Sequence, residues 1–141
     1  MSAPGWSPTV RKETFHTISL VLPHRRPGTS VLDIGCGQGW VADELTRRGV
    51  GEIAAVDVVD VRRVRTLPFW LYDGVHLPFP DARFDVAMLN FVLHHVPDER
   101  KVLLLREALR VARRRVFILE DTPTTPIDRP FLVQGIAPAF P

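Results

Sequence analysis

The sequence has a single cysteine, Cys36, and no long apolar segment. One cysteine cannot form an internal disulfide, which agrees with a reducing compartment. No apolar run approaches the roughly 18 residues that a membrane helix needs, and the first ten residues contain prolines but no apolar core typical of a secretory signal. We therefore expect a cytoplasmic protein without a membrane partner.

An excess of charge of one sign is also missing. The 18 basic and 16 acidic residues leave a formal net charge of +2, and the basic residues are 16 arginines and 2 lysines. Runs such as Arg113 to Arg115 fall where helix ends or loops are expected, and cations complement the dipole at helix C-termini. A basic patch for RNA or another polyanion is the alternative, but interleaved aromatic residues and a large net charge are absent. Nucleic acid is therefore not the expected partner.

The chain of 141 residues is long enough for one domain with a hydrophobic core. We expect residues 1–30 to form an N-terminal helix and loop, because apolar residues recur at helical spacing from Arg11 to Leu22. Residues 121–141 are expected to form a proline-rich tail with at most a short helix around Phe131 to Gln134, since five of these 21 residues are proline. The functional core is expected in residues 31–120.

A strand, a glycine turn and a helix are predicted in succession at the start of this core. Val31 to Gly39 reads Val-Leu-Asp-Ile-Gly-Cys-Gly-Gln-Gly, a short apolar strand followed by three alternating glycines. Gln38 to Arg48 has helical composition and ends at Gly49, a residue suited to a left-handed helix cap. Such a turn brings the backbone close to a ligand and directs the N–H groups of a helix N-terminus at it.

Four further apolar segments predict strands, namely Glu52 to Asp57, Leu67 to Tyr72, Phe84 to Asn90 and Val116 to Leu119. Only about two turns of helix fit between the second and third strands, from Val58 to Thr66. A longer helix is predicted from Asp98 to Ala112, with an apolar stripe that would pack on the sheet. The stripe consists of Val102, Leu105, Leu109 and Ala112, widened by Leu104, Ala108 and Val111. Strands alternating with helices predict an α/β fold with a parallel sheet.

Polar residues or glycines stand at the carboxyl ends of the predicted strands, which is where open parallel sheets bind ligands. They are Gly35 to Gly39 after the first strand, Asp57 at the end of the second, Asp73 after the third, and Asn90, His94 and His95 at and beyond the fourth. Asp57 lies 18 residues beyond Gly39, close to the roughly 20 at which nucleotide-binding α/β folds place a carboxylate for ribose hydroxyls. The alternative role of Asp57 is a helix N-cap, and Asp60 is better explained as a solvated turn residue.

The spacing of the glycines distinguishes between cofactors. A dinucleotide-binding turn, Gly-x-Gly-x-x-Gly, would place its third glycine at position 40, which is Trp40, so a nicotinamide oxidoreductase is disfavoured. Three motifs instead resemble the class I S-adenosylmethionine-dependent methyltransferases. They are Asp33-x-Gly35-x-Gly37-x-Gly39, Leu-Pro-Phe-Pro-Asp-x-x-Phe-Asp-Val from Leu77 to Val86, and Leu-His-His-Val from Leu93 to Val96. The resemblance extends from about Val31 to Glu120.

This resemblance implies a Rossmann-like fold and a site for S-adenosyl-L-methionine. Asp57 would accept the ribose hydroxyls, Asp73 would face the adenine amino group, and Asn90 would line the pocket near the sulfonium. Cys36 is interpreted as a small turn residue and not as a nucleophile. The residues implied to bind the cofactor are Asp33, Gly35, Cys36, Gly37, Gly39, Asp57, Val58, Asp73, Gly74, Asn90 and Phe91.

His94 and His95 are the candidates for a general base, because histidine titrates near neutral pH. Structural support of their loop is an equally valid interpretation, since the family shares this pair among members with many substrates. Glu120 and Asp121 are weaker candidates at the end of the fifth strand. No metal site is expected, because adjacent histidines point apart and have no third ligand at a useful spacing.

The sequence departs from the family pattern after the fifth strand, where methyltransferases of this class usually have two further strands and a helix. We therefore expect five parallel strands in the order 3-2-1-4-5, with helices on both faces and the fifth strand at an edge. We expect that edge to be covered by the tail, a second copy of the chain or another protein. The leading hypothesis is a methyltransferase that acts on a small molecule. The alternative is a non-catalytic or partner-dependent subunit that binds S-adenosylmethionine.

Overall fold

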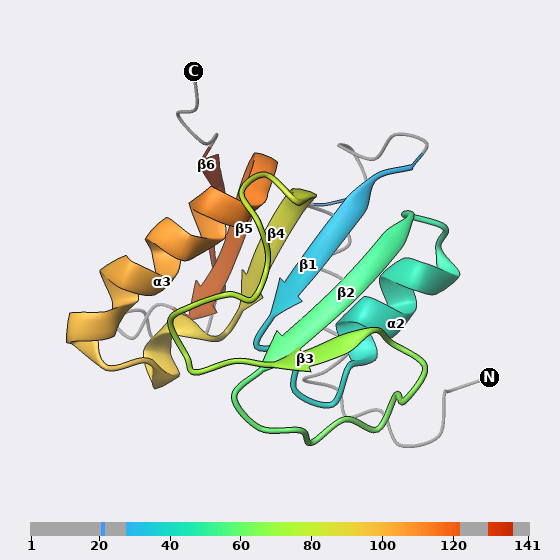
Figure 1. Cartoon of the computed structure of the whole chain (residues 1–141), viewed down its shortest axis with the longest axis horizontal. Coiled ribbons are helices and arrows are strands. Elements are labelled where there is room, and N and C mark those ends of the chain that lie inside the picture. Colours follow the sequence, from blue (N-terminus) through green and yellow to red (C-terminus); the bar gives the residue numbers. More distant parts are fainter. Residues whose placement is uncertain (1–20, 22–27, 122–129, 137–141) are drawn as a thin grey trace.

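The computed structural model describes Val21, residues 28–121 and residues 130–136 (Figure 1). Its elements in chain order are β1 (Ser30–Ile34), α2 (Trp40–Arg47), β2 (Glu52–Asp57), β3 (Phe69–Leu71), β4 (Phe84–Asn90), the short 3₁₀ helix η2 (Leu93–His95), α3 (Asp98–Val111), β5 (Ala112–Asp121) and β6 (Pro130–Ile136). The helix predicted from Arg11 to Leu22 lies outside the described residues except for Val21, which is helical and buried. Within these described ranges, no helix is long and apolar enough to cross a bilayer.

The strands form one sheet in the order β3-β2-β1-β4-β5-β6, and the first five in the chain are parallel (Figure 1). The predicted order of the five parallel strands is therefore confirmed. In β1, Leu32 pairs with Ala54 of β2 on one side and with Ala87 of β4 on the other. The chain winds from β1 to β3 in one direction and then from β4 onward in the other, so the carboxyl end of β1 is the switch point of the sheet.

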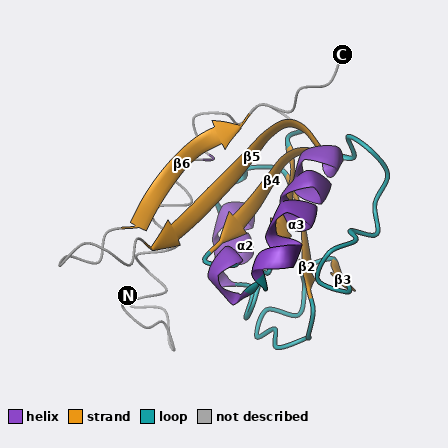
Figure 2. Cartoon of the chain, turned by 90° about the vertical axis from the view of Figure 1, so that its left-hand side faces the viewer, coloured by secondary structure: helices purple, strands orange, loops and turns teal. Residues whose placement is uncertain are grey.

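The sixth strand corrects our expectation for the C-terminal segment. The prediction of a tail with at most a short helix around Phe131 to Gln134 was wrong there: residues 130–136 form β6, antiparallel to β5 (Figure 2). β5 is consequently not an edge strand, because the chain itself supplies its neighbour. The segment contains residues that favour strands, including Phe131, Val133 and Ile136, but the prolines around it made a strand unexpected. Pro130 stands at the first strand position, where a missing N–H is tolerated.

The connection between β2 and β3 is an irregular loop, residues 58–68, and contains no helix. The N–H groups of Arg63 and Val64 donate to the carbonyl of Gln38 at 2.9 and 3.2 Å. These contacts satisfy backbone donors that a helix would have paired internally. They also attach the loop to the residues just before α2.

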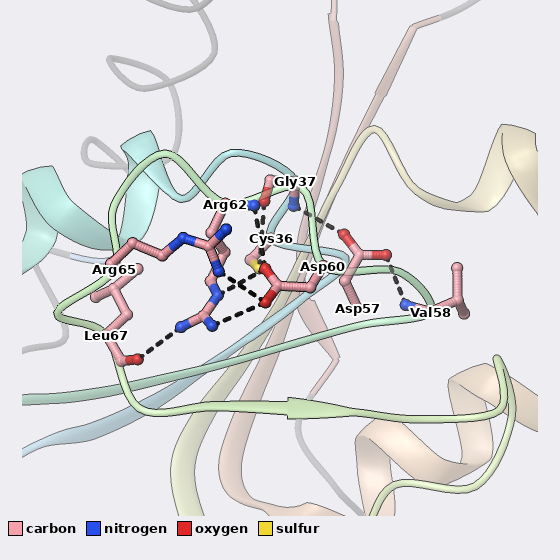
Figure 3. A network of polar contacts seen from close by, with 8 residues as sticks. All are labelled: Cys36, Gly37, Asp57, Val58, Asp60, Arg62, Arg65 and Leu67. Carbon is pink, nitrogen blue, oxygen red and sulfur yellow. Dashed lines mark hydrogen bonds and ion pairs between the residues drawn. The ribbon is translucent and has the colours of Figure 1, made fainter.

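Asp60 is the centre of an ion-pair cluster in this loop, and not merely a solvated turn residue (Figure 3). Its carboxylate accepts from Arg62 Nε at 2.9 Å and from Arg65 Nη1 at 3.0 Å. The hydrogen bond from Arg62 holds the pKa of this carboxyl well below its usual range. The guanidinium of Arg62 also donates to the Leu67 carbonyl and lies 4.1 Å from the Phe69 ring centroid. The cluster therefore fixes the loop against the edge strand β3.

Helices α2 and α3 cover the sheet through two separate apolar clusters. Successive residues of β1 belong to different clusters: Leu32 packs with α3, and Val31 packs with α2. Since neighbouring strand residues point to opposite faces, the predicted cover on both faces is present. The fully buried residues of α3 are Leu104, Ala108 and Val111. These three residues were predicted only to widen the apolar stripe, whereas Val102, which was predicted to belong to its centre, is 55% exposed. The buried face of the helix is therefore rotated relative to the predicted one.

Candidate functional site

A cavity of about 420 Å³ opens at the carboxyl ends of β1, β2 and β3, beside η2 and the start of α3. Its volume lies within the range of small-molecule sites, about 300 to 1,000 Å³. The wall is formed by Gly35, Gly37, Asp57, Val58, Tyr72, Asp73, Gly74, Phe91, Val92, His95, Val96, Pro97 and Arg100. The cavity thus occupies the switch point of the sheet, where open α/β folds bind their ligands.

The glycine turn after β1 depends on the absence of side chains. A Cβ on Gly35 would lie 2.5 Å from Val92 Cγ2, a separation that real Cβ atoms essentially never show. The N–H groups of Gly35 and Cys36 both donate to the Val56 carbonyl, at 2.9 and 3.1 Å. Gly37 has a φ of +55° and nothing within 4 Å of a Cβ placed on it. The turn is therefore fixed on the sheet side, and Gly37 is open on the cavity side.

Asp57 connects the end of β2 to this turn (Figure 3). Its Oδ2 accepts from the Gly37 N–H at 2.8 Å, and its Oδ1 accepts from the Val58 N–H at 2.7 Å. The alternative role as a helix N-cap is wrong, because residues 58–68 form a loop. A carboxylate oxygen can accept more than one hydrogen bond, so Asp57 keeps acceptor capacity at the cavity wall.

Asp33 lies behind the turn and is only 1% exposed. Its Oδ1 is buried without a hydrogen-bond partner in the described part of the chain. Burial, and then the negative charge of Asp57, raise the pKa of this carboxyl to about 7. Burial and the two carboxylates likewise raise the pKa of the Cys36 thiol to about 12. Cys36 therefore stays protonated at neutral pH and lacks the thiolate that a nucleophile needs.

The segment after β3 presents a fixed carboxylate at the cavity mouth. Asp73 Oδ1 accepts from the N–H groups of Val75 and His76, at 2.9 and 2.7 Å, and its Oδ2 lies 2.7 Å from His76 Nδ1. The hydrogen bond from His76 is the main reason why the pKa of Asp73 lies well below its usual range. Asp73 therefore remains charged at the mouth, with Gly74 beside it.

The segment after β4 forms the opposite wall. Phe91 has a φ of +54°, a conformation that costs a non-glycine residue on the order of 1 to 3 kcal/mol. Its N–H donates to the Leu119 carbonyl at 2.7 Å, which ties this strained residue to β5. Strain of this kind persists only where the surrounding structure imposes it, and it often accompanies ligand sites.

Glu120, at the end of β5, contacts the first of the two adjacent histidines. Its carboxylate accepts from the Leu93 N–H at 2.6 Å and lies 2.8 Å from His94 Nδ1. The expectation that the adjacent histidines point apart was wrong, because the His94 and His95 rings have centroids 3.9 Å apart. Only His95 of the two lines the cavity. The pair is therefore divided: Glu120 anchors His94, and His95 is exposed to a ligand.

The structure brings most of the predicted site residues together. Those on the cavity wall are Gly35, Gly37, Asp57, Val58, Asp73, Gly74, Phe91 and His95, and those off it are Asp33, Cys36, Gly39, Asn90 and His94. Gly39 has a packing role, because a Cβ there would lie 3.1 Å from Leu67 Cδ1. The wall residues that the sequence did not single out are Tyr72, Val92, Val96, Pro97 and Arg100. In the sequence, these five residues can be recognised only because they belong to, or stand next to, segments that were predicted to form the site.

The described residues contain no group of three or more histidine, cysteine, aspartate or glutamate side chains placed to hold a metal ion.

A family model described as a methyltransferase domain matches residues 8–132. The chain belongs to this methyltransferase family. Membership agrees with the position of the cavity, because open α/β sheets bind their ligands at these strand ends.

Curated relatives in this methyltransferase family differ in their acceptors. The chain is 31% identical to the demethylmenaquinone methyltransferase of Corynebacterium kroppenstedtii, over 82% of the chain and 52% of that protein. It is 32% identical to the 27-O-demethylrifamycin SV methyltransferase of Amycolatopsis mediterranei, over 62% of the chain and 36% of that protein. A tRNA (carboxymethyluridine(34)-5-O)-methyltransferase of Xenopus tropicalis is 30% identical over 62% of the chain and 14% of that protein. The chain thus spans about half the length, or less, of these relatives.

Solved structures show the same sheet architecture. The YcgJ protein of Bacillus subtilis matches with a TM-score of 0.66 and 26% identity, over 79% of this chain and 51% of that one. The [4+2]-cyclase SpnF matches with a TM-score of 0.69 and 25% identity, over 82% of this chain and 46% of that one. SpnF is described as a cyclase, so the same fold also occurs in a protein whose named reaction is not methyl transfer.

Proposed function

We propose that this methyltransferase-family chain binds S-adenosyl-L-methionine in the cavity and transfers its methyl group to a small-molecule acceptor. The proposal depends chiefly on Asp57, which is hydrogen-bonded to the glycine turn and lies on the cavity wall. A carboxylate there can accept from the two hydroxyls of a ribose while the turn brings backbone close to the rest of the nucleoside.

The residues at the cavity fit the cofactor chemically. Its positive charge suits a site with charged Asp57 and Asp73 on the wall and the partnerless Oδ1 of Asp33 behind it. Asp57 would hold the ribose hydroxyls, and Asp73 with Gly74 would meet the adenine amino group. Gly37 would leave room for the methionine part, since nothing lies within 4 Å of a Cβ placed there.

The bound cofactor would supply a methyl group attached to a positively charged sulfur, which is already a good electrophile. The chain's main contribution is then to hold two reactants in line, an effect that can reach about 7 to 11 kcal/mol of barrier. His95 is the wall residue that can accept a proton from the acceptor, which would contribute a further factor of about 100 to 10,000. Glu120 would act as a positioning residue, because it fixes His94 and the backbone N–H of Leu93 in the short helix that contains His95.

The ion pairs that many arginines form with carboxylates favour a small acceptor over RNA. Phosphate binding requires cations that are free to replace counterions. Many of the arginines already have a carboxylate partner: Arg47, Arg48, Arg62, Arg65, Arg83, Arg110 and Arg113. The demethylmenaquinone and rifamycin relatives also support a small-molecule acceptor.

Calorimetric titration with S-adenosylhomocysteine tests the cofactor site. We expect saturable binding to the whole chain, and the Asp57→Ala variant should weaken it by about 1.5 to 3 kcal/mol, the range for hydrogen bonds to a charged group. Asp81→Ala is a suitable control, because Asp81 is an exposed partner of Arg110 and is absent from the cavity wall. Equal affinities of wild type and Asp57→Ala would remove Asp57 from the site.

A second candidate is a binding subunit that needs another chain for turnover. The observation in its favour is that the chain covers only 52% of its demethylmenaquinone methyltransferase relative. Binding of S-adenosylhomocysteine without methylation of any candidate acceptor, followed by activity on addition of a partner chain, would favour it. Methylation by this chain alone would eliminate it.

A further inference from the structure

The wall of the cavity carries acidic residues from one part of the chain and basic residues from another. Asp57 and Asp73 stand at the ends of β2 and β3, whereas His95 and Arg100 belong to the segment after β4 and to the first turn of α3. Arg100 is the only arginine or lysine that the described residues contribute to this wall. The proposed function uses the acidic residues for the cofactor and gives Arg100 no role.

Arg100 differs from many other arginines of the chain in having no acidic partner. Its side chain is exposed and forms no ion pair with the residues that the structure describes. Asp98, in the same helical turn, pairs instead with Lys101 at 2.6 Å, and Asp73 on the cavity wall pairs with His76 at 2.7 Å. The guanidinium of Arg100 is therefore available to an anion that enters the cavity from solvent.

Apolar residues separate the two basic residues of this wall. Val96 and Pro97 lie between His95 and Arg100 in the chain, and both line the same cavity. Val96 also packs against the apolar cluster that α3 covers, so its position is fixed by the core. An apolar lining with a few polar groups at defined places is typical of small-molecule sites. A ligand with an apolar body on Val96 and Pro97 could therefore present one polar group to each basic residue.

We propose that the methyl acceptor is a small carboxylic acid and that Arg100 binds its carboxylate at the rim of the cavity. The proposal rests on the proposed function, since it names the class of acceptor for the same cavity. A planar guanidinium can donate two parallel hydrogen bonds to a carboxylate, which fixes the orientation of the ligand as well as its position. A doubly charged phosphate suits this wall less, because a single arginine cannot balance two negative charges in a cavity that also contains Asp57 and Asp73.

Titrations followed by ligand-detected NMR, on the whole chain saturated with S-adenosylhomocysteine, test this proposal. The probes are meta- and para-hydroxybenzoate and the corresponding hydroxybenzamides, which have nearly the same shape but no charge. We expect each hydroxybenzoate to bind about five- to tenfold more tightly than its amide, a moderate factor because Arg100 is exposed. Arg100→Ala should remove this preference, and Arg100→Lys should keep only part of it, because lysine has the charge but not the planar fork. The control Arg106→Ala changes an exposed arginine of the same helix that is absent from the wall, and should leave the preference unchanged.

The outcomes separate this proposal from the proposed function. If S-adenosylhomocysteine does not bind to the wild type, the proposed function fails and the acceptor class fails with it. If it binds, but the hydroxybenzoates do not bind or bind no more tightly than the amides, only the acceptor class is overturned. The acceptor class is also overturned if Arg100→Ala weakens binding of S-adenosylhomocysteine but not of 5′-methylthioadenosine, which lacks the carboxylate. Arg100 would then bind the amino-acid part of the cofactor and not the acceptor.

Discussion

The burial of Asp33 predicts that the free protein loses stability as pH rises through the neutral range. The pKa of this carboxyl is raised from 3.8 to about 7 in the folded chain, so between these values the folded state binds the proton more tightly than the unfolded state does. Stability from this group is complete below about pH 4, declines as pH rises toward 7, and stays lost above it. The difference between the two pKa values corresponds to on the order of 4 kcal/mol.

Urea unfolding from pH 5 to pH 8 in the absence of ligand measures the part of this loss that falls above pH 5, about 2 to 3 kcal/mol. Asp33→Asn cannot titrate, so its stability should change much less across the same range. His76, whose pKa is raised chiefly by its hydrogen bond to Asp73, changes stability in the same direction but is present in both proteins and cancels in the comparison. The carboxyls with lowered pKa values, such as Asp85 and Glu107, act at more acidic pH. Parallel stability profiles for the two proteins would refute the reasoning.

Three further predictions concern the walls of the cavity. Gly35→Ala should destabilise the fold by about 1 to 3 kcal/mol and abolish binding of S-adenosylhomocysteine, because its methyl group would meet Val92 and its φ is +74°. Thermal melts measure the loss of stability and calorimetry measures the loss of binding; normal binding would contradict the close approach to Val92. Glu120→Gln should keep cofactor affinity but lower the turnover rate and change its pH profile, since it weakens the anchor of His94; an unaltered profile would leave Glu120 a purely structural role. Arg110→Ala should cost about 2 to 3 kcal/mol in urea unfolding, because the guanidinium donates to the Leu77 and Phe79 carbonyls, whereas a loss within about 0.5 kcal/mol would show that these contacts contribute little.

The central strands and the glycine turn could be predicted because their signals are local. β2 and β4 have the bounds that their apolar runs predict, and each ends in the polar residue expected, Asp57 and Asn90. Strand order also followed from alternation of strands and helices together with the family resemblance. The approach of Asp57 to Gly37 is a consequence of this order, because neighbouring parallel strands end at the same side of the sheet.

What the sequence hid were contacts between distant segments. β6 was missed because its strand formers lie among prolines, and only pairing with β5 selects the extended form. The loop after β2 replaces a helix because Arg62 and Asp60 bind each other and Gln38 accepts from the loop backbone. The separate positions of His94 and His95 depend on Glu120, which is 26 residues away from His94 in the chain.

The direct junction of α3 and β5 has a consequence for the far side of the molecule. Helix ends at Val111 and strand begins at Ala112, so no linker absorbs a change in helix length. Inserting one residue in the middle of α3 would turn its first half by about 100° and advance it by about 1.5 Å. Pro97 and Arg100 would then swing out of the wall that they help to form. The width of the cavity therefore depends on the number of residues in α3.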